Sequence, residues 1–191
     1  RDDVESRGLG DVYKRQLCTL IKDAIKERNQ FIGIEDGRIV AAYIMNHDRD
    51  EAYHAVKWLI DANDNETVVL HALRVLPEYG GHGYSKQLVQ HAIDTARERN
   101  LKSIRLDCIE GNDIPQKMYM SFGFKYVDKV EITYVDIGVP RKFLLYEFVL
   151  YSRHNNSYIL NIVQTNSSLP HRTQNTILAE QFLSLIHISE P

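Results

Sequence analysis

The chain is poor in cysteine and has no long apolar run. Its 191 residues include only two cysteines, Cys18 and Cys108, which lie far apart and match no metal-binding spacing. Cys108 falls in an apolar stretch, so we expect it to be a buried free thiol in a reducing compartment. The sequence therefore offers no disulfide framework, and we expect a cytoplasmic protein without a metal.

The chain also lacks a strong charge of either sign. It has 26 acidic and 23 basic side chains, which gives a net charge of −3. Proteins that bind nucleic acid or membrane surfaces in general carry a marked basic excess. No apolar run approaches the roughly 20 residues that span a bilayer. We therefore expect neither nucleic acid nor membrane as a partner, and the length fits one domain.

The two ends of the chain are related to each other at the level of DNA. Residues 8–16 and 183–191 can be encoded by one string and its reverse complement. That string resembles the adapter used in transposase-based DNA sequencing libraries, and chance is a poor explanation. We therefore expect residues 1–16 and 183–191 to be translated adapter. Residues 17–150 are then the folded domain, and residues 151–182, rich in Asn, Ser, Thr and Gln, a poorly ordered tail of uncertain origin.

Hydrophobic periodicity predicts alternating helices and strands between these ends. The predicted helices cover residues 17–28, 85–100 and 113–122, and the predicted strands 30–35, 38–45, 52–60, 68–75, 103–109, 125–134 and 143–150. Asp36-Gly37 is a strong signal for a two-residue hairpin turn. The order indicates an α+β fold, with a mixed, largely antiparallel sheet and helices on both faces.

A glycine loop between a strand and a helix is the most informative feature. Pro77 ends the apolar strand 68–75, and Ser85 opens the next helix. Three glycines lie between them: Gly80, Gly81 and Gly83. Such loops bind phosphate because glycine lets the backbone approach the anion, where N–H groups converge and the helix dipole favours negative charge. A plain turn is the alternative, and the position before a helix favours binding.

A second motif follows at residues 106–124. It reads Leu106-Asp107-Cys108-Ile109-Glu110-Gly111-Asn112, and then come Tyr119 and Gly123-Phe124. With the glycine loop, it resembles the GNAT superfamily of acyl-CoA-dependent N-acyltransferases. In that family the loop reads Gln/Arg-x-x-Gly-x-Gly/Ala; Gly83 matches it, whereas Gly80 and Ser85 depart from it. The resemblance covers residues 30–150 and implies a GNAT-like fold that lacks its first strand and first helix.

The resemblance implies acetyl-CoA as co-substrate and an amine of a small molecule or peptide as acceptor, with a homodimer as the candidate assembly. Loop N–H groups would hold the pyrophosphate, and the strand beside the loop would pair with the pantetheine arm. Asn112 would contact the cofactor or merely cap its helix. The implied cofactor-binding residues are Leu73, Val75, Gly80, Gly81, His82, Gly83, Tyr84, Ser85 and Asn112.

Acyl transfer to an amine needs a proton acceptor, because an alkylammonium has a pKa of about 10.4. Tyr119 is the candidate acid for the leaving thiolate, by resemblance; packing on a helix face is its alternative. His71 is one candidate base, since it lies two residues before Leu73 and would share its strand face. Asp107 is the other, and either could be purely structural. A non-catalytic acyl-CoA-binding or regulatory module is the alternative function.

Overall fold

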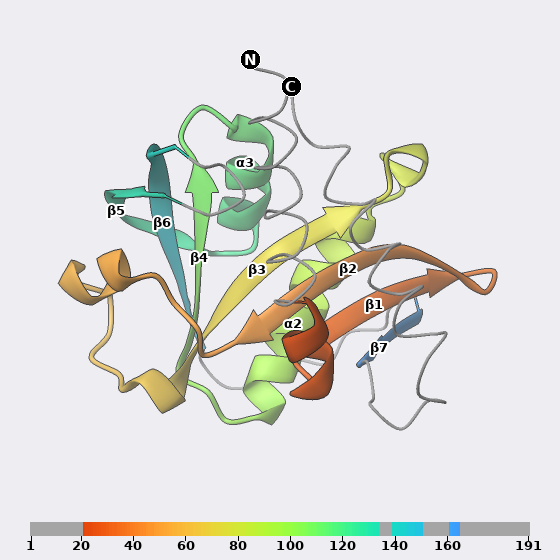
Figure 1. Ribbon diagram of the computed structural model, residues 1–191, viewed down its shortest axis with the longest axis horizontal. Coiled ribbons are helices and arrows are strands. Elements are labelled where there is room, and N and C mark those ends of the chain that lie inside the picture. Colours follow the sequence, from red (N-terminus) through yellow and green to blue (C-terminus); the bar gives the residue numbers. More distant parts are fainter. Residues whose placement is uncertain (1–20, 134–138, 151–160, 165–191) are drawn as a thin grey trace, which may run out of the picture.

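The structure is a computed structural model that describes residues 21–133, 139–150 and 161–164. Its strands form one sheet in the order β5-β6-β4-β3-β2-β1-β7 (Figure 1). The strands are β1 Gln30–Glu35, β2 Arg38–Asn46, β3 Thr67–Val75, β4 Ser103–Ile109, β5 Lys125–Ile132, β6 Arg141–Val149 and β7 Asn161–Gln164. Only β3 and β4 pair in parallel; the other neighbours are antiparallel. The predicted mixed, largely antiparallel sheet is therefore confirmed.

The hairpin between β1 and β2 has the predicted two-residue turn. Glu35 pairs with Arg38, and the two residues between them have positive φ angles, 47° at Asp36 and 76° at Gly37. A turn of type I′ requires positive φ at both central residues, which Asp and Gly tolerate best. The Asp36-Gly37 signal therefore predicted both the place and the kind of turn.

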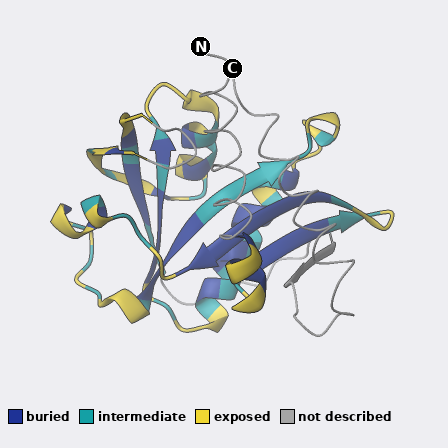
Figure 2. Cartoon of the chain, in the orientation of Figure 1, coloured by how far each residue is buried: buried dark blue, intermediate teal, exposed yellow. Residues whose placement is uncertain are grey.

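Helices cover both faces of the sheet, as predicted. Helix α2, Tyr84–Glu98, packs on one face with α3, Asp113–Ser121 (Figures 1 and 2). The helical residues 21–26 pack on the other face, against β1 and β2. The buried side chains of α2 recur every three or four residues: Leu88, Val89, Ala92, Ile93 and Ala96. Each large apolar side chain fully buried in this way stabilises the fold by roughly 1.5–3 kcal/mol.

One predicted strand is wrong. Residues 52–60 do not form a strand; instead the 3-10 helix η1, Glu51–Ala55, begins the connection between β2 and β3, and the 3-10 helix η2, Asp64–Glu66, ends it. The Asp50 side chain accepts a hydrogen bond of 2.9 Å from the Ala52 N–H, which fixes the start of η1. The apolar side chains in this stretch, Tyr53 and Val56, pack on the sheet face opposite α2 without joining the sheet.

The remaining predicted elements are present, with ends shifted by one or two residues in the described part. Strand β7 is an addition, because residues 161–164 lie in the segment expected to be poorly ordered and yet pair with β1. Residues 1–20 and 165–191, and with them both predicted adapter segments, lie outside the described residues. No helix in the described part of the chain is long and apolar enough to cross a membrane.

Candidate functional site

The two parallel strands at the centre of the sheet separate along their length. Only Thr67, Val68 and Val69 of β3 pair with β4. Beyond them, β3 stays paired with β2 and β4 stays paired with β6, so the strands diverge toward their carboxyl ends (Figure 1). Residues 71–75 of β3 are only half-buried, and no described strand pairs with this edge beyond Val69. The Leu73 carbonyl accepts a 3.0 Å hydrogen bond from the Arg74 guanidinium. The other backbone groups on this edge of β3, near Leu73 and Val75, are available to pair with a ligand.

A bulge at Ala72 bends β3 within this open stretch. Ala72 has φ of 49°, and the register with β2 shifts there, with His71 opposite Ile44 and Arg74 opposite Ala42. The extra residue breaks the two-residue alternation of the strand. His71 therefore faces the side of residues 21–26, whereas Leu73 packs on the α2 side. The prediction that these two side chains share one face is wrong.

The glycine loop leads directly into the first turn of α2. Gly81 and Gly83 have φ of 82° and 79°, and a Cβ added at either would meet no atom within 4 Å. Gly83 is the N-cap of α2, and no side chain caps the helix. The prediction that Ser85 opens the helix is wrong, because the helix starts at Tyr84. The first N–H groups of a helix have no intrahelical partner, so this end can receive an anion.

Contacts between aromatic side chains hold the glycine loop in place. The His82 ring lies 5.9 Å from Tyr79 and 5.4 Å from Tyr84, centroid to centroid. The Tyr84 hydroxyl donates a hydrogen bond to the Glu35 carboxylate, which raises the pKa of Tyr84 to about 12. The first residue of α2 is therefore tied to the end of β1.

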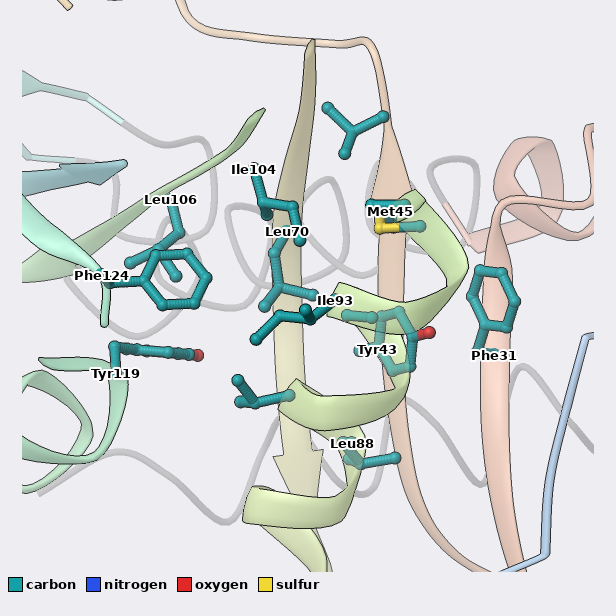
Figure 3. Close-up of a cluster of buried hydrophobic side chains, with 14 of the residues drawn as sticks. Phe31, Tyr43, Met45, Leu70, Leu88, Ile93, Ile104, Leu106, Tyr119 and Phe124 are labelled. Atoms are coloured by element: carbon teal, nitrogen blue, oxygen red, sulfur yellow. The ribbon is translucent and has the colours of Figure 1, made fainter. Parts of the chain in front are cut away.

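Tyr119 lies on α3 and reaches toward the separation of the two strands. Its side chain is buried, packs edge-to-face on Phe124, and extends from α3 toward β3 (Figure 3). Burial raises the pKa of Tyr119, and the nearby Cys108 and Asp107 act in the same direction, against the positive charge of Arg74. The phenol is therefore protonated at neutral pH and close to residues of both diverging strands.

Asp107 and His71 approach from the opposite face. The Asp107 carboxylate accepts a 2.7 Å hydrogen bond from the Tyr53 hydroxyl. The Nε2 atom of His71 lies 3.0 Å from the Asp48 carbonyl oxygen, and must carry the proton because a carbonyl only accepts. Burial lowers the pKa of His71, opposed by the negative charges of Asp107 and Asp48. The imidazole is therefore neutral at neutral pH.

The negative charge of Asp107 acts to raise the pKa of both His71 and Tyr119. Of the three predicted catalytic residues, Asp107 and His71 lie on the face opposite α2, and Tyr119 packs on the α2 face. Asn112 is the exposed N-cap of α3, and its side chain makes no capping hydrogen bond, so its amide does not serve the helix. The contact of Tyr53 with Asp107 was not predicted from the sequence. Residues 52–60 were predicted as a strand, and no motif marked Tyr53 as a neighbour of the site.

Cys108 is buried, and burial raises the pKa of its thiol to about 12. It is therefore a neutral thiol, as expected, whereas Cys18 lies outside the described residues. No group of three His, Cys, Asp or Glu side chains in the described part of the chain could hold a metal ion.

Comparison with solved structures places the fold among acetyltransferases. A putative acetyltransferase from Staphylococcus aureus Mu50 matches with TM-score 0.54 and 21% identity, over 75% of this chain and 87% of that one. An N-acetyltransferase from the same organism matches with TM-score 0.51 and 17% identity, over 63% and 66%. A putative acetyltransferase from Salmonella typhimurium, solved with its cofactor acetyl-CoA, matches with TM-score 0.50 and 17% identity, over 66% of each chain.

This chain thus spans about two thirds of the length of two of these structures, and their low identity establishes the fold alone. No curated protein matches the sequence. The sequence does match the family model described as "Acetyltransferase (GNAT) family", over residues 5–124, a match that begins inside the predicted adapter segment. Since that model covers well over half of the chain, the chain belongs to the GNAT acetyltransferase family of enzymes.

Proposed function

We propose that this protein transfers an acetyl group from acetyl-CoA to a primary amine of a small molecule or peptide, by direct attack of the amine on the thioester. The observation that carries the proposal is the open edge of β3, which leads into a glycine loop and the uncapped start of α2. The pantetheine arm that carries the thioester needs an open strand edge to pair with. The pyrophosphate needs the N–H groups of the glycine loop and of the helix start.

The residues available to acetyl-CoA fit its chemistry. The pyrophosphate meets N–H groups of residues 81–85, where the two positive-φ glycines keep the approach open. The Gly80 N–H donates to the Pro77 carbonyl oxygen at 2.9 Å, so Gly80 lines the site without donating to it. The pantetheine amides pair with the backbone of Leu73 and Val75. The free amide of Asn112 adds a polar contact at the start of α3. A backbone N–H near Leu73 stabilises the negative charge that develops on the carbonyl oxygen.

The amine must lose a proton before or during its attack. Asp107 and the neutral His71 are the groups that can accept it, and they lie on the face of the sheet opposite the glycine loop and α2. The amine therefore arrives from this second face, while acetyl-CoA occupies the first. As the C–N bond forms and the C–S bond breaks, the Tyr119 hydroxyl donates its hydrogen to the leaving sulfur.

Release of the CoA thiol in the presence of amines tests the function. A panel of small amines and peptides is incubated with acetyl-CoA and protein, with Gly83→Asp as the matched variant that should not bind acetyl-CoA. Amine-dependent thiol release by the native chain, and none by Gly83→Asp, supports the proposal. Tight acetyl-CoA binding without release for any amine would instead favour a non-catalytic acyl-CoA-binding module. We also propose that the protein is cytoplasmic and forms a homodimer.

A further inference from the structure

The connection between β2 and β3 crosses the sheet instead of forming a short hairpin. It covers residues 47–66 and carries η1 to the face opposite α2, where Tyr53 and Val56 pack against apolar residues of β5 and β6. There Tyr53 is 1% exposed and its hydroxyl donates to Asp107 Oδ2 at 2.7 Å. A residue more than 50 positions away in sequence thus contacts the candidate base directly.

A chain of contacts holds this connection on the sheet. Glu147 on β6 is fully buried and accepts hydrogen bonds from the Leu59 N–H at 2.7 Å and from Arg105 Nε at 2.9 Å. The Arg105 guanidinium lies 4.2 Å above the Trp58 ring. The Trp58 indole N–H donates to the Tyr53 carbonyl at 3.0 Å. Buried charges on β4 and β6 therefore fix the position of η1.

The Asp107 carboxylate is contacted by the Tyr53 hydroxyl from η1. Its negative charge also acts on the pKa of His71 on β3 and of Tyr119 on α3. Cys108 follows Asp107 on β4 and is a neutral thiol. The residue that pairs with Asp107 on β6, Leu145, is apolar. Asp48 also acts on the pKa of His71 and Arg74 on that of Tyr119, and Arg105 on β4 is paired with Glu147 on β6. Tyr53 is thus the hydroxyl that binds the Asp107 carboxylate from the acceptor side.

We propose that Tyr53 is a positioning residue that holds the Asp107 carboxylate for deprotonation of the amine, and that residues 47–66 form the wall of the acceptor side. This inference rests on the proposed function. A carboxylate on a strand can rotate about its side-chain bonds, and a 2.7 Å hydrogen bond from a buried phenol restricts that rotation. Orientation of a catalytic group by a neighbour of this kind raises the rate without touching the substrate.

The test compares Tyr53→Phe with Tyr43→Phe. Tyr43 is also fully buried, and its hydroxyl makes a bond of the same length, 2.7 Å, to His91 on the α2 side of the sheet. We expect Tyr53→Phe to lower kcat about tenfold or more and to move the acidic limb of the pH profile to higher pH, because a carboxylate that loses a donor becomes more basic. Tyr43→Phe should change kcat less than about twofold, and acetyl-CoA affinity should be unchanged in both.

The same substitution in an Asp107→Asn background separates positioning from general support of the fold. If Tyr53 acts through Asp107, Tyr53→Phe should lower kcat there by less than about twofold. An equal loss in both backgrounds, or a pH profile like that of Tyr43→Phe, would overturn the inference while leaving the function in place. If the native chain binds acetyl-CoA but releases no thiol with any amine, the function itself fails, and the inference fails with it.

Trp58→Phe provides a second variant in case Tyr53→Phe does not fold. It removes the indole N–H that binds the Tyr53 carbonyl and keeps a ring beneath Arg105. We expect a smaller loss of kcat with the same direction of pH shift. No shift in this variant together with a native kcat would contradict the role of the connection.

Discussion

Tyr119, Asp107 and His71 come from three elements, α3, β4 and β3, beside the part of the sheet where β3 and β4 separate. The surroundings of Tyr119 and of His71 both favour the neutral form. Burial raises the pKa of Tyr119, so that it keeps its proton, and lowers the pKa of His71, so that it stays neutral. A proton donor and a proton acceptor on opposite sides of a reacting centre are what amine acylation requires.

Replacement of Tyr119 by Phe tests the donor. Phe keeps the buried ring and its contact with Phe124, so the fold should persist while the donated hydrogen is lost. We expect kcat to fall roughly ten- to ten-thousandfold, with less effect on acetyl-CoA affinity. Steady-state kinetics and calorimetry measure the two quantities.

Tyr126→Phe is the control for Tyr119→Phe, because Tyr126 is 51% exposed on β5 and should tolerate the change. Full activity of Tyr119→Phe would mean that water or the amine product supplies the proton. Tyr119 would then have only a packing role.

At the scale of elements, the site depends on how β3 ends and α2 begins. The Ala72 bulge turns the end of β3, and Gly83 places the start of α2 in a left-handed backbone conformation at the N-cap. An L-residue other than Asn or Asp costs about 1–2 kcal/mol in that conformation. Both features set the positions of backbone donors, while the ring contacts of Tyr79, His82 and Tyr84 hold the loop.

Gly83→Asp and Gly83→Asn form a matched pair for the anion site. Both side chains tolerate positive φ, cap helices and have nearly the same shape, but only Asp adds negative charge where the pyrophosphate would bind. We expect Asp to weaken acetyl-CoA binding at least about tenfold more than Asn, with a difference that shrinks as salt rises. Calorimetry at two salt concentrations measures it; equal affinities for the two variants would refute the loop assignment.

The sequence predicted the elements well where local signals agreed. β1 and β4 have their predicted bounds, because apolar runs lie between clear turn residues. Residues 52–60 were wrongly predicted as a strand because Tyr53, Val56 and Trp58 are residue types that are common in strands. In the structure these side chains pack on a face of the sheet, and their backbone does not pair with it. The bulge at Ala72 could not be predicted, since alanine rarely adopts positive φ and no glycine marks the position.

The candidate site was predictable only in part for the same reason. Its loop and the positions of Tyr119, Asp107 and Asn112 follow from motifs that are local in sequence. The face of His71 depends on the bulge, and the contact of Tyr53 with Asp107 depends on the path of a long connection. Tertiary contacts of this kind leave no periodic signal in the sequence.

At the scale of the whole molecule, two half-buried histidines couple stability to pH. Burial lowers the pKa of both His71 and His91 below the ordinary value of 6.5. The folded state then binds fewer protons than the unfolded state between the two pKa values, so this stability is complete above 6.5 and is lost as pH falls. We expect the free energy of unfolding to drop from pH 7 to pH 5, by at most about 1.4 kcal/mol per pH unit for each histidine.

Denaturant unfolding of the native chain and of His71→Gln at several pH values measures this effect. The difference between the two removes the contribution of carboxylates that both proteins share. The variant should lose less stability on acidification. Parallel curves for the two proteins would show that His71 is protonated alike in the folded and unfolded states.

We propose that acetyl moves from CoA directly to an amine at the separation of β3 and β4. Isotope-labelled acetyl-CoA, the native chain and an amine that supports thiol release test it, with mass spectrometry of the amine and of the protein. We expect labelled amide in amounts equal to the free CoA, and no label on the protein, because the buried Cys108 thiol, with a pKa of about 12, is not a nucleophile at neutral pH. Label on Cys108, or CoA release without labelled amide, would contradict it.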